Sequence, residues 1–303
     1  SFYYVMLNDR SKSLLQYHLM VLIFGFSSVL GALISLSAIP LVIYRMGLAS
    51  IGLAFYFILY KPQYFYLSRK MWGKVFIGGI IIAIHWVTFF YAIKIAGVSL
   101  TLSMMATGAF ITSIIEPLLT NRKILLYEIL FGGLTAIGVG LIFNAEFEQF
   151  KAILIALFSA FLSALFTILN NQMVKKVIPI TLSFYQLLVG ALVGIIYVFF
   201  FGEYAFNDFQ LNEYDWIFIL ILSWFCTSYA FNISIKVMKH LSAFTIMMII
   251  NLEPIYGILI SLAIWNEREY MSLTFYIGLL IVLGSILLNG LYKNKKEGSK
   301  KQT

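Results

Sequence analysis

This 303-residue sequence contains few of the groups from which catalytic and metal-binding sites are built. It has one cysteine, Cys226, and three histidines on separate segments, which exclude an internal disulfide framework and argue against a metal cluster. The H-E-x-x-H metal motif, the G-x-S-x-G nucleophile motif and a glycine-rich phosphate loop are all absent. We therefore expect a protein that is not an enzyme, holds no cofactor or metal and does not hydrolyse ATP.

Charged residues are also scarce, at 11%, whereas 61% of residues are hydrophobic and the mean hydropathy is +0.93. A helix needs about 20 apolar residues to cross the hydrocarbon layer of a membrane. Ten such stretches run through the chain, at 19–38, 41–60, 74–94, 99–119, 124–143, 152–173, 180–201, 215–236, 242–265 and 270–292. The predicted fold class is an all-α integral membrane protein with ten transmembrane helices and no separate soluble domain. No A-x-A-like site follows the first stretch, so we expect no cleavable signal peptide.

The few charges alternate in sign from loop to loop. Lys and Arg are retained on the cytoplasmic side of a membrane, and they concentrate in every second loop, in the segment 1–18 and in the tail 293–303. The acids of the intervening loops are Glu146, Glu148, Glu203, Asp208, Glu213, Asp215, Glu267 and Glu269. Both termini are therefore predicted to be cytoplasmic, and the net charge of +8 reflects membrane orientation rather than nucleic-acid binding. We expect a multi-pass protein of the cell membrane, specifically a bacterial inner membrane, with the lipid bilayer as a partner.

The two halves of the chain, 19–148 and 149–292, resemble each other. Each half has an aromatic residue in its first span, a polar residue 21 or 20 positions later in its second, and two glycines six apart in its fifth. These residues are Phe24, Arg45, Gly132 and Gly138 in the first half and Phe166, Gln186, Gly278 and Gly284 in the second. Because five spans is an odd number, two copies must lie in opposite orientations. Inverted repeats are typical of secondary transporters; a chance similarity between Leu- and Ile-rich helices is the alternative.

A second apparent repeat disappears when the two halves are aligned on their glycines. Glu116-Pro117 and Glu253-Pro254 look alike, but Glu116 lies 16 residues before the first glycine of its fifth span, and Glu253 lies 25 before its counterpart. Gly108 falls near the register of Pro254 instead. The two Glu-Pro pairs are therefore not expected to occupy equivalent positions.

With these features the sequence resembles the drug/metabolite transporter superfamily and, within it, the EamA-type transporters, over residues 18–292. The residues that carry the resemblance are Phe24-Gly25, Pro40, Arg45, Leu252–Gly257, Trp265–Arg268, Gly278 and Gly284. Gly108 stands where the family commonly has a proline, and Asn121 where an acid is common. The resemblance implies that the first, third, fourth, sixth, eighth and ninth helices surround a central cavity, with the fifth and tenth flanking the bundle.

Two ionisable residues near the middle of spans are the proton-coupling candidates. Glu253 precedes Pro254, which cannot donate a backbone hydrogen bond, and an ionisable group at that depth is by default a functional hypothesis. Its carboxyl group is a candidate for binding a cationic substrate group or a coupling proton, whereas a protonated Glu bonded to a neighbouring helix is the alternative. His85 is the second candidate because histidine titrates near neutral pH; a structural buried histidine is the alternative.

Polar and aromatic residues on one helix face indicate a cavity wall. In span eight, Trp224, Ser228 and Asn232 are spaced i, i+4 and i+8, which predicts a single helical stripe. Interhelical hydrogen bonding is the alternative. The complete set predicted to bind substrate or to line the cavity is His85, Trp86, Phe89, Trp224, Thr227, Ser228, Asn232, Glu253 and Tyr256.

Arg45, Glu116 and Pro254 are interpreted as gating or structural residues. Arg45 lies just inside the outer end of span two, where the resembled family has an arginine across varied substrates. Glu116 lies near the inner end of span four, where an inner gate is one interpretation and pairing with Arg122 or Lys123 is the simpler one.

The sequence favours a secondary transporter that moves a small polar or amphipathic metabolite, an amino acid or related compound, by alternating access. The resemblance implies export. Two other classes stay open: a membrane sensor or structural partner that does not transport, and an intramembrane enzyme that uses His85 and Glu253. The small-residue stripe Gly132, Ala136 and Gly140 predicts close helix packing and also allows a homodimer.

Overall fold

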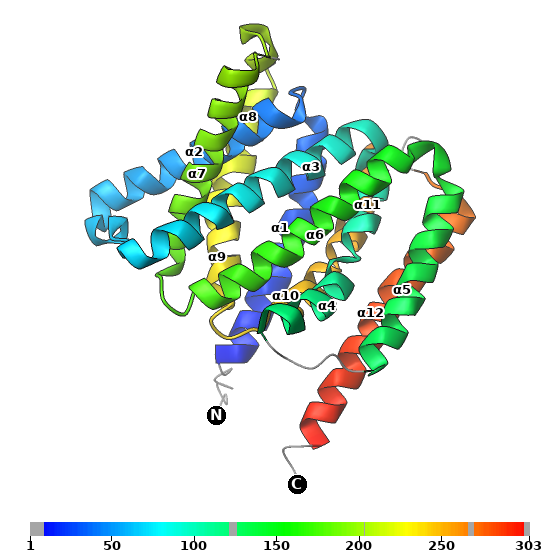
Figure 1. Ribbon diagram of the computed structural model, residues 1–303. Helices are drawn as coiled ribbons and strands as arrows, with labels where there is room; N and C mark the ends of the chain where they lie inside the picture. Colours follow the sequence, from blue (N-terminus) through cyan, green and yellow to red (C-terminus); the bar gives the residue numbers. More distant parts are fainter. Residues whose placement is uncertain (1–8, 121–125, 203, 266–269, 300–303) are drawn as a thin grey trace, which may run out of the picture.

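The structure is a computed structural model that describes residues 9–120, 126–202, 204–265 and 270–299. Every regular element in these ranges is a helix (Figure 1). The elements are α1 (Asp9–Leu33), α2 (Ala38–Tyr60), η1 (Pro62–Phe65), η2 (Arg69–Met71), α3 (Trp72–Met105), α4 (Gly108–Thr120), α5 (Leu126–Ala145), η3 (Phe147–Gln149), α6 (Phe150–Met173), α7 (Pro179–Phe201), η4 (Phe206–Phe209), α8 (Asp215–Leu220), η5 (Ile221–Tyr229), α9 (Ala230–Val237), α10 (Ala243–Ile250), α11 (Glu253–Trp265) and α12 (Leu273–Ser299). Asn121, Arg122, Lys123, Glu203, Glu267, Arg268 and Glu269 lie outside the described residues.

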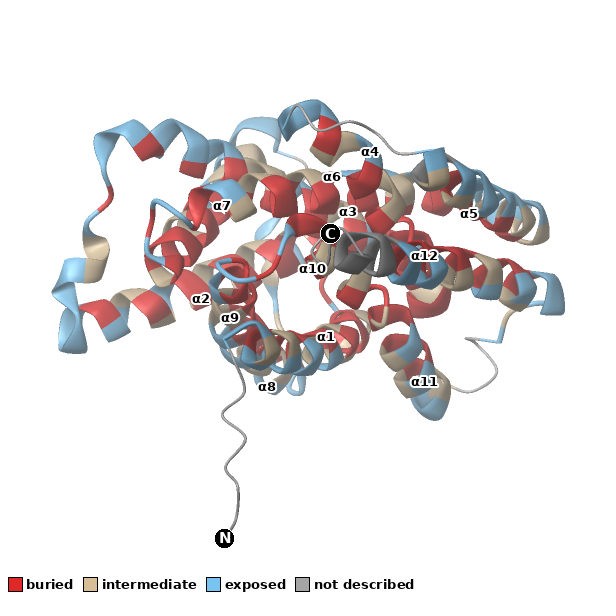
Figure 2. Ribbon diagram, turned by 90° about the horizontal axis from the view of Figure 1, so that it is seen from below, coloured by how far each residue is buried: buried red, intermediate tan, exposed pale blue. Residues whose placement is uncertain are grey.

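Eight segments of the described chain are long and apolar enough to cross a membrane, and two shorter apolar helices cover Gly108–Thr120 and Leu130–Ala145. Large apolar side chains lie exposed on the outer faces of the helices, such as Phe199 at 81% and Leu280 at 70%. Figure 2 shows the buried residues on the inner faces instead. Water-soluble proteins rarely expose so much apolar surface. The protein is therefore an all-helical, multi-pass membrane protein.

The first helix is longer than the predicted span 19–38. It begins at Asp9, and its first turns carry exposed polar side chains, including Lys12 and Gln16. A hydropathy pattern detects only the part of a helix that meets lipid, so a polar extension of the same helix is not seen. α2 then begins at Ala38, with Pro40 in its first turn, where the missing proline N–H costs little.

Predicted spans 74–94 and 99–119 are divided differently from the prediction. α3 continues to Met105 and bends at Gly97, whose φ of 83° and ψ of 174° are accessible essentially only to glycine. A second break follows, where the N–H of Thr107 donates to the Met104 carbonyl at 3.1 Å. α4 then begins at Gly108.

Span 242–265 is interrupted in the same way. α10 ends at Ile250, the N–H of Leu252 donates to the Ile249 carbonyl at 3.0 Å, and α11 begins at Glu253. Glu253 therefore lies in the first turn of its helix, whereas Glu116 lies well inside α4. This placement agrees with the alignment that separated the two Glu-Pro pairs.

Two tyrosines make reciprocal contacts where α2 packs against α7. The hydroxyl of Tyr44 on α2 donates to the Phe209 carbonyl of η4 at 3.0 Å, and the hydroxyl of Tyr185 on α7 donates to the Phe65 carbonyl of η1 at 2.7 Å. Because η1 follows α2 and η4 follows α7, each tyrosine holds the turn that follows the other helix.

α5 and α12 run alongside each other at one side of the bundle (Figure 1). A Cβ atom on Gly138 would lie 2.8 Å from the Gly278 carbonyl oxygen, and one on Gly278 would lie 2.7 Å from the Gly138 oxygen. Close helix packing thus occurs within the chain, at these glycines. In the predicted stripe, Gly132 packs against Phe110, whereas nothing lies within 4 Å of a Cβ on Gly140.

Gly97→Ala is expected to destabilise the protein, because alanine at this backbone conformation costs roughly 1–3 kcal/mol. Thermal unfolding in detergent would measure the loss. Gly73→Ala on the same helix is the matched control, since a Cβ there meets nothing within 4 Å. Equal melting temperatures for the two variants would contradict the explanation of the bend.

Candidate functional site

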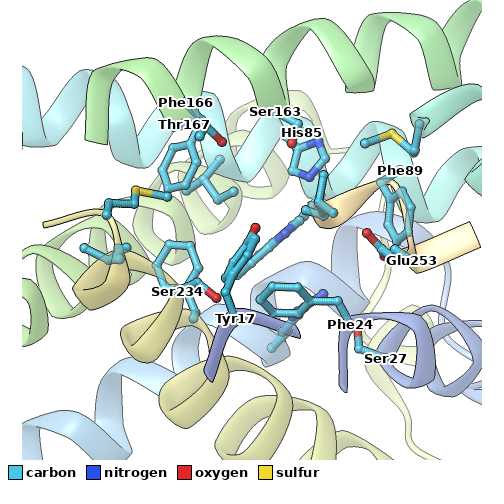
Figure 3. Close-up of a pocket in the computed structure, with 18 residues that line it drawn as sticks. Tyr17, Phe24, Ser27, His85, Phe89, Ser163, Phe166, Thr167, Ser234 and Glu253 are labelled. Carbon is cyan, nitrogen blue, oxygen red and sulfur yellow. The ribbon is translucent and has the colours of Figure 1, made fainter. Parts of the chain in front are cut away.

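A cavity of about 80 Å³ lies inside the bundle between α1, α2, α3, α6, α9 and α11 (Figure 3). This volume admits several water molecules. Its polar lining consists of Tyr17, Ser27, Arg45, His85, Ser163, Thr167, Ser234 and Glu253, and its aromatic lining of Phe24, Trp86, Phe89, Phe166 and Phe231. The cavity therefore combines aromatic walls with a few polar groups, which is the usual composition of a small-molecule site.

Arg45 is the cation of this cavity, and only 2% of its surface is exposed. Its Nε donates to Thr227 Oγ1 at 2.7 Å, and its guanidinium carbon lies 3.9 Å from the centre of the Trp86 ring. The centre of the Phe90 ring lies 5.4 Å from the guanidinium carbon. A cation over an aromatic face is attracted by the ring quadrupole, most strongly when water is excluded. These contacts fix the guanidinium plane at the cavity wall.

Thr227 reaches Arg45 because span eight is not a regular α-helix. Residues Ile221–Tyr229 form a π-helix, in which hydroxyl groups bond to carbonyls five residues back. Thr227 Oγ1 donates to Leu222 at 2.7 Å, and Ser228 Oγ lies 3.2 Å from the Ser223 carbonyl. Short π-helices are rare and often occur at functional sites. Here the π-helix places a hydroxyl next to a buried charge.

His85 is held from one side by Ser159 on α6. Its Nδ1 lies 3.0 Å from the Ser159 carbonyl oxygen, and the Ser159 hydroxyl donates to the His85 carbonyl at 2.9 Å. The Ser159 hydroxyl also lies 2.9 Å from Nδ1. A carbonyl oxygen only accepts, so the bond from Nδ1 to the Ser159 carbonyl requires the tautomer with a hydrogen on Nδ1. Nε2 is then the basic atom of the neutral ring, and it is the atom left to the cavity that His85 lines.

Glu253 is the carboxylate of the cavity, 8% exposed, in the first turn of α11. Tyr17 on α1 and Arg45 on α2 are both close enough to interact with it electrostatically. Figure 3 shows Tyr17, His85 and Glu253 around the same space from three different helices. One basic and one acidic side chain therefore share a small buried volume.

The structure brings together some of the predicted lining residues and separates others. His85, Trp86, Phe89 and Glu253 line the cavity, together with Arg45 from the predicted gating set. Trp224, Thr227, Ser228, Asn232 and Tyr256 are not among its lining residues.

Two residues of the predicted stripe on span eight contact α2 and not the cavity. Trp224 is 52% exposed and donates to the Leu48 carbonyl at 3.2 Å, and Ser228 donates to the Ala49 carbonyl at 3.0 Å. Both side chains therefore contact α2 from the outer side. Asn232 lines a different cavity, which also contains Lys12 and Lys236.

Three further predicted residues lie outside the central cavity. Tyr256 packs against Gly25 at the contact between α1 and α11. Pro254 is buried in the first turn of α11. Glu116 lines a separate space together with Arg10.

Several residues that line the cavity were not predicted from the sequence. Tyr17 lies before residue 19, where the first span was expected to begin. Ser163 and Thr167 are spaced i, i+4 on α6, and this stripe was detectable in the same way as that of span eight. Phe231 and Ser234 lie beyond the π-helix, where α-helical spacing no longer predicts the face.

Comparisons with known proteins bear on the second half most directly. Residues 150–291 match the model of the EamA-like transporter family. None of the curated proteins matches the chain. Among solved structures 27 chains match. One, described only as a crystal structure of a protein, has a TM-score of 0.68 and 12% identity, covering 93% of this chain and 98% of its own. That likeness shows a shared fold.

Thr227→Val removes the hydroxyl that accepts from Arg45 while keeping the side-chain shape. We expect a loss of about 1.5–3 kcal/mol in the free energy of unfolding, because a buried charge loses a hydrogen bond. Denaturation in detergent would measure it. Ser223→Ala is the matched control, since its equally buried hydroxyl has no hydrogen-bond partner in the described part of the chain. A Thr227→Val variant no less stable than this control would contradict the assigned role.

Proposed function

Since the chain belongs, through residues 150–291, to the EamA-like transporter family, we propose that it is a secondary transporter for a small polar or amphipathic metabolite. The proposed substrate class is an amino acid or a related zwitterion, and the proposed direction is export across a bacterial inner membrane. The observation that carries the proposal is the pair of opposite charges, Arg45 and Glu253, buried at one aromatic-walled cavity inside the bundle.

The chemistry of the two charges suits a zwitterion. A guanidinium group matches a carboxylate in geometry and charge, and a carboxylate suits a primary ammonium group. Buried charges must be paired or neutralised. A bound zwitterion would give each of them a direct partner. The aromatic residues Phe24, Phe89 and Phe166 would contact the apolar part of the substrate.

Glu253 and His85 are the proposed proton carriers. A carboxylate that leaves an ammonium partner inside a low-dielectric cavity is stabilised by taking up a proton instead. Nε2 of His85 is the other basic atom at the cavity, since Nδ1 is engaged with Ser159. Binding of substrate and binding of a proton would therefore be linked.

Alternating access is proposed to use two inverted five-helix halves, with ten crossings and cytoplasmic termini. The breaks before Gly108 and before Glu253 support this arrangement, because interrupted helices at corresponding positions of two halves mark transporter binding sites. The hydrogen bonds of Tyr44 and Tyr185 support it as well. Tyr44 of the first half bonds to η4 of the second half, and Tyr185 of the second half bonds to η1 of the first half. The two halves would rock about the cavity to open one end at a time.

Counterflow in proteoliposomes tests the proposal. Vesicles loaded with an unlabelled amino acid mixture should take up labelled amino acid from outside, and Glu253→Gln should reduce the initial rate at least tenfold, because it removes the charge without changing the volume. An imposed pH gradient should change accumulation by the wild-type protein and leave the variant unaffected.

Glu148→Gln is the matched control, because Glu148 is exposed and lies outside the cavity. Ligand binding without flux would favour the sensor class, and conversion of a lipid or peptide without flux would favour the intramembrane enzyme. Either result would refute transport.

A further inference from the structure

The end of the bundle where α1 turns into α2 is held by charged groups that the cavity does not use. Lys94 of α3 donates from Nζ to the carbonyls of Ala32, at 3.5 Å, and of Ile34. A helix leaves its last carbonyls without partners inside the helix, and a cation there is favoured by the helix dipole. Lys94 therefore fastens the end of α1 to α3, within the first half of the chain.

Asp215, the first residue of α8, fastens the same turn to the second half. Its Oδ1 accepts from the backbone N–H of Ser35 at 2.9 Å, and its Oδ2 accepts from the Ser35 hydroxyl and from the N–H of Asn212 at 3.0 Å. Asp215 is 3% exposed and interacts electrostatically with Lys94. A carboxylate, a lysine and a turn of backbone thus form one cluster across the two halves.

The cluster lies beyond the wall of the cavity, toward the end of α1. Ser27 on α1 and Phe89 on α3 line the cavity. One turn after Ser27, Gly31 packs so closely on Phe90, the residue after Phe89, that a Cβ atom on Gly31 would not fit. Lys94 and the turn at Ile34 follow in the next turn of each helix. α1 and α3 are therefore sealed together between the cavity and this end of the bundle.

We propose that Lys94 and Asp215 form a latch that closes this end of the transport pathway, and that the cavity opens to this side when Ser35 leaves Asp215. The proposal rests on the alternating-access function above. Lys94 holds α1 within its own half, so the contact of Asp215 with Ser35 must break, together with that of Tyr44 with Phe209, for the halves to separate at this end. The latch also explains why Lys94 lies at the predicted outer end of the bundle, where basic residues are disfavoured. Its charge is paired there with Asp215.

Cysteine accessibility tests the latch. The native Cys226 is buried and would be replaced by alanine, and Ser27→Cys would report on the cavity. A membrane-impermeant thiol reagent is applied to intact cells and, separately, to inverted vesicles. Asp215→Asn should speed labelling at least tenfold from the α1–α2 side and should not speed labelling from the other side. Unchanged labelling, or faster labelling from both sides, would overturn the latch.

Asp208→Asn is the matched control, because Asp208 is exposed in the loop before α8 and accepts from the N–H of Ala205, a bond within that loop. If Asp215→Asn does not fold, Ser35→Ala removes one of the three donors to Asp215, and it should speed labelling from the same side by about threefold; no change would overturn the latch. Counterflow by the wild-type protein is measured in parallel. Flux without faster labelling refutes the latch alone, and faster labelling without flux refutes the transport function alone.

Discussion

The burial of one positive charge, that of Arg45, constrains the centre of this protein. A guanidinium group inside a membrane bundle is costly unless its surroundings satisfy it. Three features supply that satisfaction: the face of Trp86, the hydroxyl of Thr227 and the charge of Glu253 across the cavity. The π-helix in span eight carries Thr227, whose hydroxyl accepts from Arg45. The break before α11 contributes in turn, since it places Glu253 at a helix start that faces the cavity.

The repeat proposed from the sequence matches positions that differ in charge. It aligns Phe24 with Phe166, and both line the cavity. It aligns Arg45 with Gln186, which pairs instead with Asn170 through two amide hydrogen bonds, of 3.2 and 2.7 Å. A neutral amide pair is satisfied by itself and needs no ion nearby. On the proposed repeat, the charge of Arg45 is therefore present at only one of the two matched positions.

Sequence reasoning located those parts of the site that rest on regular helices. His85, Trp86 and Phe89 follow ordinary α-helical spacing on α3, and Glu253 was visible as an ionisable residue within an apolar run. Trp224 and Ser228 were predicted to line the cavity and contact α2 instead. No residue pattern indicates the π-helix that carries them. The bend at Gly97 was also hidden, since hydropathy does not depend on φ. Helix existence thus follows from composition, whereas helix breaks depend on local backbone geometry.

The opposite charges of the cavity also bear on how an empty carrier could return. Buried net charge makes any conformational change across a low-dielectric layer costly. With Arg45 and Glu253 both ionised, the empty cavity is neutral, and a bound zwitterion leaves the sum unchanged. The loaded form and the empty, unprotonated form therefore differ in contacts but not in net charge. On the proposed mechanism the empty carrier takes up a proton on Glu253, which replaces the substrate's ammonium group as the partner of the carboxylate and so couples the two fluxes.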